Sequence, residues 1–200
     1  CYAQEAGEQL IVETGADVVV GNGEKNQILP MITRWMERRD AITAPEPEPS
    51  TDQICISDLA TCREYEPQTI TGQEDHARVY VKIQDGCDRF CSYCMIPYLR
   101  GRSRSRDPEA VWQEAAGLAA GGCREIVLTG IDISSYSWTA PGEQNVYGLR
   151  ELLERLGQIP ELARIRLGSL EPRTVDEAFC RALSGYVNLC PQFHLSLQSG

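Results

Sequence analysis

The chain has 200 residues, of which 42% are hydrophobic and 24% are charged, and its formal net charge is −10. This length and composition are typical of one or two folded domains and exclude a disordered or fibrous chain. No run approaches the roughly 18 consecutive apolar residues that a membrane span requires, so no membrane association is expected.

The cysteines indicate the redox compartment of the protein, and the two ends of the chain indicate whether it is a fragment. Nine cysteines could indicate a secreted disulfide scaffold, but those scaffolds are small, whereas this chain has enough apolar residues for a sizeable core. We therefore expect a reducing, cytoplasmic setting. Because the chain begins at Cys1 rather than at methionine and stops at Gly200, just after a strand-like run, we expect an internal fragment of a longer protein.

The N-terminal part predicts a helix, a strand and a second helix. Glu5 to Glu13 can form a helix, and residues 17–21 are a short apolar run that ends in glycine, as buried parallel strands do. Residues 24–39 carry apolar side chains at helical spacing, although Pro30 lies within the first two turns. We expect residues 1–44 to be the C-terminal part of an α/β domain.

Charge is distributed unevenly over the next two segments. Residues 45–75 begin with alternating proline and glutamate and carry eight acidic side chains against Arg63 alone, a net charge of −7. This composition predicts an extended acidic linker. Residues 78–106 carry seven basic and two acidic side chains, a net charge of +5. Because local potential decides where a polyanion binds, the total charge does not exclude a nucleic acid partner.

Strand and helix patterns alternate regularly in residues 76–200. The expected strands are residues 79–84, 125–129, 163–167 and 192–197. The expected helices are residues 108–120, with Asp107 as cap and Gly121 as stop, residues 148–156, and a helix capped by Thr174. Such repeats imply right-handed βαβ units and a parallel sheet. The fold class is therefore α/β, with four strand–helix units forming the first part of an open barrel.

Three cysteines in one short loop are the strongest functional signal. Cys87, Cys91 and Cys94 stand in GCDRFCSYC, in a C-x3-C-x2-C spacing. Thiolates suit iron–sulfur clusters, zinc or copper, and such centres usually need four ligands. Three thiolates leave one metal vertex free for a substrate or cofactor. The alternatives are a zinc site with a distant fourth ligand, or a loop of free thiols.

Polar residues also follow the other expected strands. In parallel barrels, functional side chains gather where strands end. Here the strand ends are followed by Thr129-Gly130-Ile131-Asp132, by Gly168 to Pro172, and by His194 to Gly200.

An arginine-rich segment directly follows the cysteine loop. Its four arginines alternate with glycine or serine, a pattern that suits phosphate contacts. They are Arg100, Arg102, Arg104 and Arg106. The alternatives are a solvated loop or a clamp for a carboxylate.

These motifs together resemble the tRNA methylthiotransferases, which are radical S-adenosylmethionine (SAM) enzymes. The likeness is carried by VKIQDGCDRFCSYCMIPYLRGRSRSR at 81–106, GADVVVGNGEK at 15–25, LTGIDISSY at 128–136, IRLGSLEP at 165–172 and LCPQFHLSLQSG at 189–200. The pattern is most similar to the enzymes that act on N6-threonylcarbamoyladenosine, with Asp132 where histidine is expected. It is less similar to the enzymes that act on isopentenyladenosine or on a ribosomal protein.

The resemblance implies a fold and a set of site residues. Residues 1–44 would end an N-terminal methylthiotransferase domain, residues 45–75 would be the linker, and residues 76–200 would begin a radical SAM (β/α) barrel. The cysteines of the loop, Cys87, Cys91 and Cys94, would ligate a [4Fe-4S] cluster. Residues expected to bind cofactor or line its cavity are Tyr93, Thr129, Gly130, Asp132, Glu171, Ser196 and Gln198. Cys1 would be one ligand of a second cluster whose other ligands lie upstream.

The implied activity is the transfer of a methylthio group to C2 of N6-threonylcarbamoyladenosine at position 37 of tRNA. The implied cofactors are [4Fe-4S] clusters and SAM. The implied partners are the tRNA anticodon stem-loop, an electron donor such as flavodoxin or ferredoxin, and a source of sulfur. No catalytic side chain is identified. The alternatives are a related methylthiotransferase with another substrate, and a non-catalytic cluster or zinc protein that binds RNA.

Overall fold

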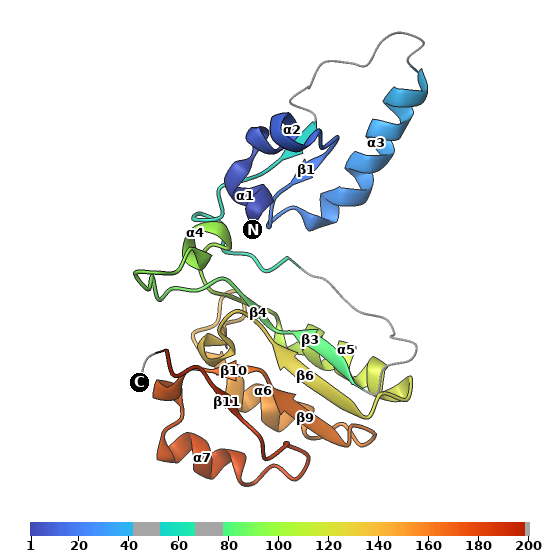
Figure 1. Ribbon diagram of the computed structural model, residues 1–200. Helices are drawn as coiled ribbons and strands as arrows, with labels where there is room; N and C mark the ends of the chain where they lie inside the picture. Colours follow the sequence, from blue (N-terminus) through green and yellow to red (C-terminus); the bar gives the residue numbers. More distant parts are fainter. Residues whose placement is uncertain (42–52, 67–77, 199–200) are drawn as a thin grey trace. The chain divides into compact units, whose positions relative to one another are not determined.

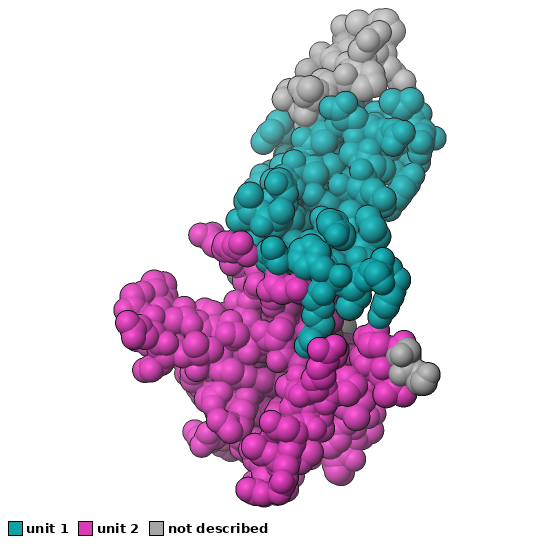
Figure 2. All heavy atoms as spheres, turned by 90° about the vertical axis from the view of Figure 1, so that its left-hand side faces the viewer, with its two compact units in different colours: residues 1–62, 89–102 teal, residues 63–88, 103–200 magenta. Residues whose placement is uncertain are grey.

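The computed structural model describes residues 1–41, 53–66 and 78–198, which divide into two compact units. The first unit comprises Cys1–Cys62 and Arg89–Arg102, and the second comprises Arg63–Asp88 and Ser103–Gly200 (Figure 2). The proline-rich start of the expected linker lies outside the described residues. Its later part, residues 53–66, is structured and is shared between the two units.

The first unit contains a small α/β element. Strands β1 (Val19–Val20) and β2 (Ile54–Cys55) pair in parallel, so part of the expected linker forms a strand (Figure 1). A 3-10 turn at Lys25–Gln27 leads into α3 (Ile28–Ala41). The remaining helices of this unit are α1 (Tyr2–Ala6), α2 (Glu8–Thr14) and α4 (Ile96–Leu99).

One helix expected in the first unit is two helices. The sequence predicts a single helix from Glu5 to Glu13, but Gly7 has φ 53° and separates α1 from α2. Positive φ is incompatible with a right-handed helix and costs glycine less than other residues. The apolar face of α3 is also less buried than its spacing suggests, because Met31 is buried whereas Leu29 is 72% exposed.

The second unit is built on a parallel sheet with the strand order β3 (Val79–Lys82), β6 (Glu125–Thr129) and β9 (Arg164–Leu167). In its register, Val81 pairs with Leu128, and Leu128 pairs with Leu167. Two short strands, β10 (Ser169–Leu170) and β11 (His194–Leu195), continue the parallel arrangement. The expected α/β fold with parallel strand–helix units is confirmed.

Helices α5 (Pro108–Ala120), α6 (Leu149–Leu156) and α7 (Glu177–Leu183) belong to this unit. Val81 and Ile83 of the sheet region and Leu152 of α6 are fully buried in one apolar core. Each side chain of this size contributes about 1.5–3 kcal/mol on burial. Figure 1 shows α5 and α6 running alongside the strands, as crossover helices of βαβ units do.

The helix caps were predicted with mixed success. The carboxylate of Asp107 accepts a hydrogen bond from the Glu109 amide and begins α5, as expected. Thr174 does not cap α7, because residues Pro172–Thr174 form a 3-10 turn of their own. Asp176 caps α7 instead, accepting a 2.7 Å hydrogen bond from the Phe179 amide.

Two short antiparallel pairs were not expected from the sequence. Strand β4 (Gln84–Asp85) pairs with β5 (Arg104–Ser105), and β7 (Ser137–Trp138) pairs with β8 (Tyr147–Gly148). A 3-10 turn at Ile133–Ser135 precedes β7. None of the helices in the described ranges is long and apolar enough to cross a bilayer.

Candidate functional site

The carboxyl ends of the parallel strands place three loops at one edge of the second unit. Gly86 and Cys87 follow β3 and β4, Gly130 to Asp132 follow β6, and Glu171 follows β10. Because neighbouring parallel strands point the same way, their carboxyl ends meet at one edge, where ligands bind in parallel α/β folds. The expected cofactor-binding loops therefore lie at the edge that the fold favours for a site.

The three cysteines of the loop are available as ligands. Each is partly exposed and none is in a disulfide. Cys87 belongs to the second unit, while Cys91 and Cys94 belong to the first, where the Cys94 amide donates a 2.9 Å hydrogen bond to the Cys91 carbonyl. Thiolates are the ligands that iron–sulfur clusters use, so the chemistry of these three side chains fits such a cluster. Across residues 1–41, 53–66 and 78–198, no three Cys, His, Asp or Glu side chains are already grouped to hold a metal ion.

Exposed aromatic side chains flank Cys91 and Cys94. Phe90 and Tyr98 pack edge to face with their ring centres 5.5 Å apart, and the Arg102 guanidinium lies 4.6 Å from the Phe90 ring centre. Phe90 has φ 47°, an uncommon conformation for a residue other than glycine. Tyr93, expected beside the cofactor, is 71% exposed. This segment therefore carries exposed aromatic rings, one of which has a guanidinium group over it.

The four arginines that follow the loop differ in environment. Arg104 and Arg106 are buried, with Arg106 paired to the buried Glu114 and Arg104 lying 3.9 Å from Asp85. Buried guanidinium groups with carboxylate partners cannot also reach phosphates, so the expectation of RNA contact for these two is not supported by their position. Arg100 and Arg102 are partly exposed, and Arg100 donates to the Asn22 side chain.

The loop after β6 is held by a residue that the sequence did not single out. Thr129 and Gly130 are partly exposed and Asp132 is 9% exposed. The amides of Ile131 and Asp132 both donate to the side-chain oxygen of Gln84, which is fully buried. A lone glutamine at a strand end gives no sequence signal of function. The one signal in the sequence is Gly130, which leaves room for the close approach of Gln84.

Of the remaining predicted residues, Glu171 follows β10, and Ser196 and Gln198 follow β11. Glu171 donates its amide proton to the Ser134 hydroxyl, and its carboxylate lies 3.5 Å from Arg173. The Ser196 amide donates to the Leu170 carbonyl, and Gln198 is exposed with φ 69°. Cys1 is exposed and belongs to the first unit.

Comparison with known proteins finds one matching family and several relatives. Residues 81–200 match the Radical SAM superfamily. The chain is 32% identical over its whole length to threonylcarbamoyladenosine tRNA methylthiotransferase MtaB of Aquifex aeolicus, covering 45% of that protein. It is 33% identical over its whole length to the tRNA-2-methylthio-N(6)-dimethylallyladenosine synthase of Syntrophus aciditrophicus, covering 40% of it. The chain thus spans less than half the length of these curated relatives.

A solved structure shares the fold at low sequence identity. The radical SAM methyltransferase TsrM of Kitasatospora setae superposes with a TM-score of 0.61 at 16% identity. The superposition covers 98% of this chain and 40% of that one. The sequence match over residues 81–200 carries the family assignment, and the parallel strand–helix fold agrees with it. The chain belongs to the radical SAM superfamily.

Proposed function

We propose that this chain is part of a radical SAM methylthiotransferase that adds a methylthio group to C2 of N6-threonylcarbamoyladenosine at position 37 of tRNA. The observation that carries the proposal is the three-cysteine loop, which begins at the carboxyl edge of a parallel sheet inside the matched residues. Relatives named for this reaction support the choice of substrate.

The chain's own residues would bind and orient the cofactors. Cys87, Cys91 and Cys94 would supply three thiolates, leaving one iron open. Thr129, Gly130 and Asp132 would hold the amino group of SAM, and Tyr93 would pack against its adenine. Glu171, Ser196 and Gln198 would line the cavity of the cofactor.

The substrate explains why side chains alone would not suffice. Carbon 2 of adenine bears an aromatic C–H with no acidic proton and no leaving group, so general acid–base catalysis cannot activate it. When bound, a [4Fe-4S] cluster and SAM supply the radical chemistry for such a bond. The protein contributes orientation and exclusion of water. In the longer protein, an electron donor such as flavodoxin or ferredoxin, a source of sulfur, and a second cluster with Cys1 as one ligand would complete the reaction in the cytoplasm.

Cluster binding is tested by anaerobic reconstitution of the full chain with iron and sulfide. We expect the absorption and paramagnetic spectra of a [4Fe-4S] cluster, with a change in the spectrum when SAM is added. Cys91→Ala should abolish both, because two thiolates do not hold the cluster. Cys62→Ala, which removes another partly buried thiol of the same unit, should leave both intact. A Cys91→Ala protein that keeps a complete SAM-responsive cluster would refute the assignment.

A second candidate substrate is N6-isopentenyladenosine, because relatives named for dimethylallyladenosine match at similar identity, 33% against 32%. Mass spectrometry of nucleosides, from tRNA of cells with and without the full-length protein, distinguishes the two. The proposal expects the mass of a methylthio group on threonylcarbamoyladenosine. A methylthio group on isopentenyladenosine instead would select the second substrate. A methylthio group on neither nucleoside would leave a cluster protein that binds RNA.

A further inference from the structure

Gln84 is the most completely buried polar side chain at the candidate site. It is the first residue of β4, two positions after the last residue of β3, and its exposed fraction is 0%. A buried amide without hydrogen bonds would be strongly destabilising, so its partners show what the residue does. Its hydrogen-bond partners belong with it to the second unit and include Gly86, Ser103, Ile131 and Asp132.

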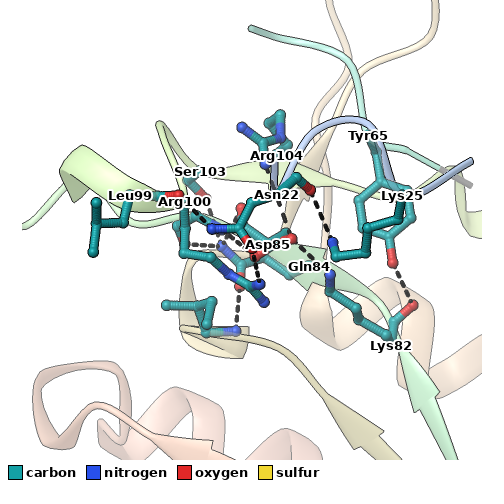
Figure 3. A network of polar contacts seen from close by, with 12 residues as sticks. Asn22, Lys25, Tyr65, Lys82, Gln84, Asp85, Leu99, Arg100, Ser103 and Arg104 are labelled. Atoms are coloured by element: carbon teal, nitrogen blue, oxygen red, sulfur yellow. Dashed lines mark hydrogen bonds and ion pairs between the residues drawn. The ribbon is translucent and has the colours of Figure 1, made fainter. Parts of the chain in front are cut away.

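The two ends of the Gln84 amide hold different loops. Its oxygen accepts hydrogen bonds from the amides of Ile131 (3.0 Å) and Asp132 (2.9 Å). Its nitrogen donates to the Gly86 carbonyl at 2.7 Å. It also donates to the Ser103 hydroxyl at 3.0 Å (Figure 3). Two N–H donors on one side and carbonyl and hydroxyl acceptors on the other fix the orientation of the amide. The side chain therefore joins the loop after β6 to the residue before Cys87.

The glycine at position 130 is fitted to this clamp. A Cβ atom at Gly130 would lie 2.8 Å from the Gln84 carbonyl oxygen and 2.9 Å from its side-chain oxygen. Both distances are shorter than real Cβ contacts, and one of them is to backbone. A side chain at position 130 would therefore collide with Gln84, and glycine leaves room for the close approach. This fit does not depend on the hydrogen bonds of Gln84.

Two serines extend the same network. The Ser103 hydroxyl lies 3.0 Å from the Ser135 hydroxyl, and the Ser135 hydroxyl donates to the Asp132 carbonyl at 2.8 Å. Asp132 is thus held at its amide by Gln84 and at its carbonyl by Ser135. Connected hydrogen bonds of this kind, with Gln84 buried and the two serines partly buried, restrict a loop to one conformation.

We propose that Gln84 is a positioning residue for SAM binding, which fixes Gly130 to Asp132 against the start of the cysteine loop. This inference rests on the proposed function for the roles of the two loops. Gln84 itself touches backbone and hydroxyl groups of the protein, so it acts through them. Its effect should therefore appear in the order of the loop after β6 and in the affinity for SAM.

Two substitutions separate the halves of the clamp. Gln84→Met has similar length and removes both the donor and the acceptor, whereas Gln84→Glu keeps an acceptor for the Ile131 and Asp132 amides and removes the donors. Tyr136→Phe is the matched control. It removes another buried hydrogen bond of the second unit, 2.8 Å long, to the carbonyl of Arg106.

The measurements use the full chain reconstituted with iron and sulfide. Amide hydrogen exchange at residues 131 and 132 is followed without cofactor, and the dissociation constant for SAM is read from the change in the cluster spectrum. Gln84→Met should speed exchange at both amides and weaken SAM binding by about tenfold, the ratio that corresponds to roughly 1.4 kcal/mol. Gln84→Glu should keep the amides protected and weaken SAM binding by less. Tyr136→Phe should lower the melting temperature and leave both readouts unchanged.

The outcomes distinguish this inference from the proposed function. If Gln84→Met lowers the melting temperature as Tyr136→Phe does, but changes neither exchange nor SAM affinity, Gln84 is a packing residue and the inference fails. If Gln84→Met does not fold, Gln84→Glu decides the question. A Gln84→Glu protein whose amides at 131 and 132 lose protection while its SAM affinity stays unchanged would contradict the inference. If the unsubstituted chain shows no SAM response, the proposed function fails, and amide exchange alone decides whether Gln84 holds the loop.

Discussion

The second unit contains buried charged residues of two kinds, the ion pair of Arg106 with Glu114 and the carboxylate of Asp85. Arg106 and Glu114 are both nearly inaccessible and pair with each other. Removing one partner of such a pair leaves the other charge buried, which is usually strongly destabilising. Asp85, by contrast, joins Lys82 at 2.6 Å and also accepts from the Gly86 amide at 2.9 Å, so its charge fixes the residue before Cys87. Arg106 and Glu114 therefore depend on each other in the core, whereas Asp85 also shapes the site.

Glu125 provides a pH-dependent contribution at the start of β6. A hydrogen bond from Arg164, supported by Arg166, lowers the pKa of its carboxyl group, against an opposing effect of burial. A lowered pKa means that the stabilisation is present above the unfolded-state value, about 4.3, and is lost as the pH falls through the folded-state value.

Glu125→Gln should therefore reduce the free energy of unfolding at pH 7 by about 1–2 kcal/mol and by progressively less at acidic pH. Chemical denaturation between pH 7 and pH 3 measures the difference. Glu177→Gln is the control, because its pair with Arg181 is highly exposed, and its effect should stay below about 0.5 kcal/mol. An effect of Glu125→Gln that is constant over this pH range would contradict the assignment of the stabilisation to the carboxylate.

At the scale of elements, local signals predicted helices best where both ends were marked. Helix α5 begins at Pro108, after the cap Asp107, and ends before Gly121, as the sequence predicts. The cap, the fixed φ of proline and the glycine stop all act locally. The cysteine loop and the polar strand ends were also predictable, since motif spacing and sheet direction determine them. The role of Gln84 was not predictable, because most of its hydrogen-bond partners are distant in sequence. They include Ser103 and the loop after β6.

The cap of α7 illustrates the opposite case. Thr174 and Asp176 are both acceptable caps, and only the 3-10 turn at Pro172–Thr174 assigns the cap to Asp176. Asp176→Ala should reduce stability by about 1 kcal/mol, because the Phe179 amide loses its acceptor. Thr174→Ala should have an effect near zero. Thermal denaturation of the two variants checks this, and equal losses would show that the cap was assigned to the wrong residue.

At the scale of the whole molecule, net charge and local charge have opposite signs where RNA contact is proposed. The chain carries −10, yet residues 78–106 carry seven basic and two acidic side chains, a net charge of +5. Burial removes Arg104 and Arg106 from that local surface, while Arg100 and Arg102 remain partly exposed. Arg102 also lies over the Phe90 ring, so the segment offers both a cation and an aromatic face, the combination used for single-stranded bases.

Replacing Arg100 and Arg102 by glutamine should therefore weaken tRNA binding by the full-length protein. The log–log slope of affinity against salt should fall by roughly one for each lost phosphate contact, because fewer counterions are released. Replacing Arg150 and Arg181 changes the net charge by the same amount at exposed positions of the second unit, and its slope should stay at the unsubstituted value. Equal slopes for the two double variants would mean that total charge governs the interaction. A changed slope for Arg100 and Arg102 alone would place the phosphate contacts beside the cysteine loop, where the target base must arrive.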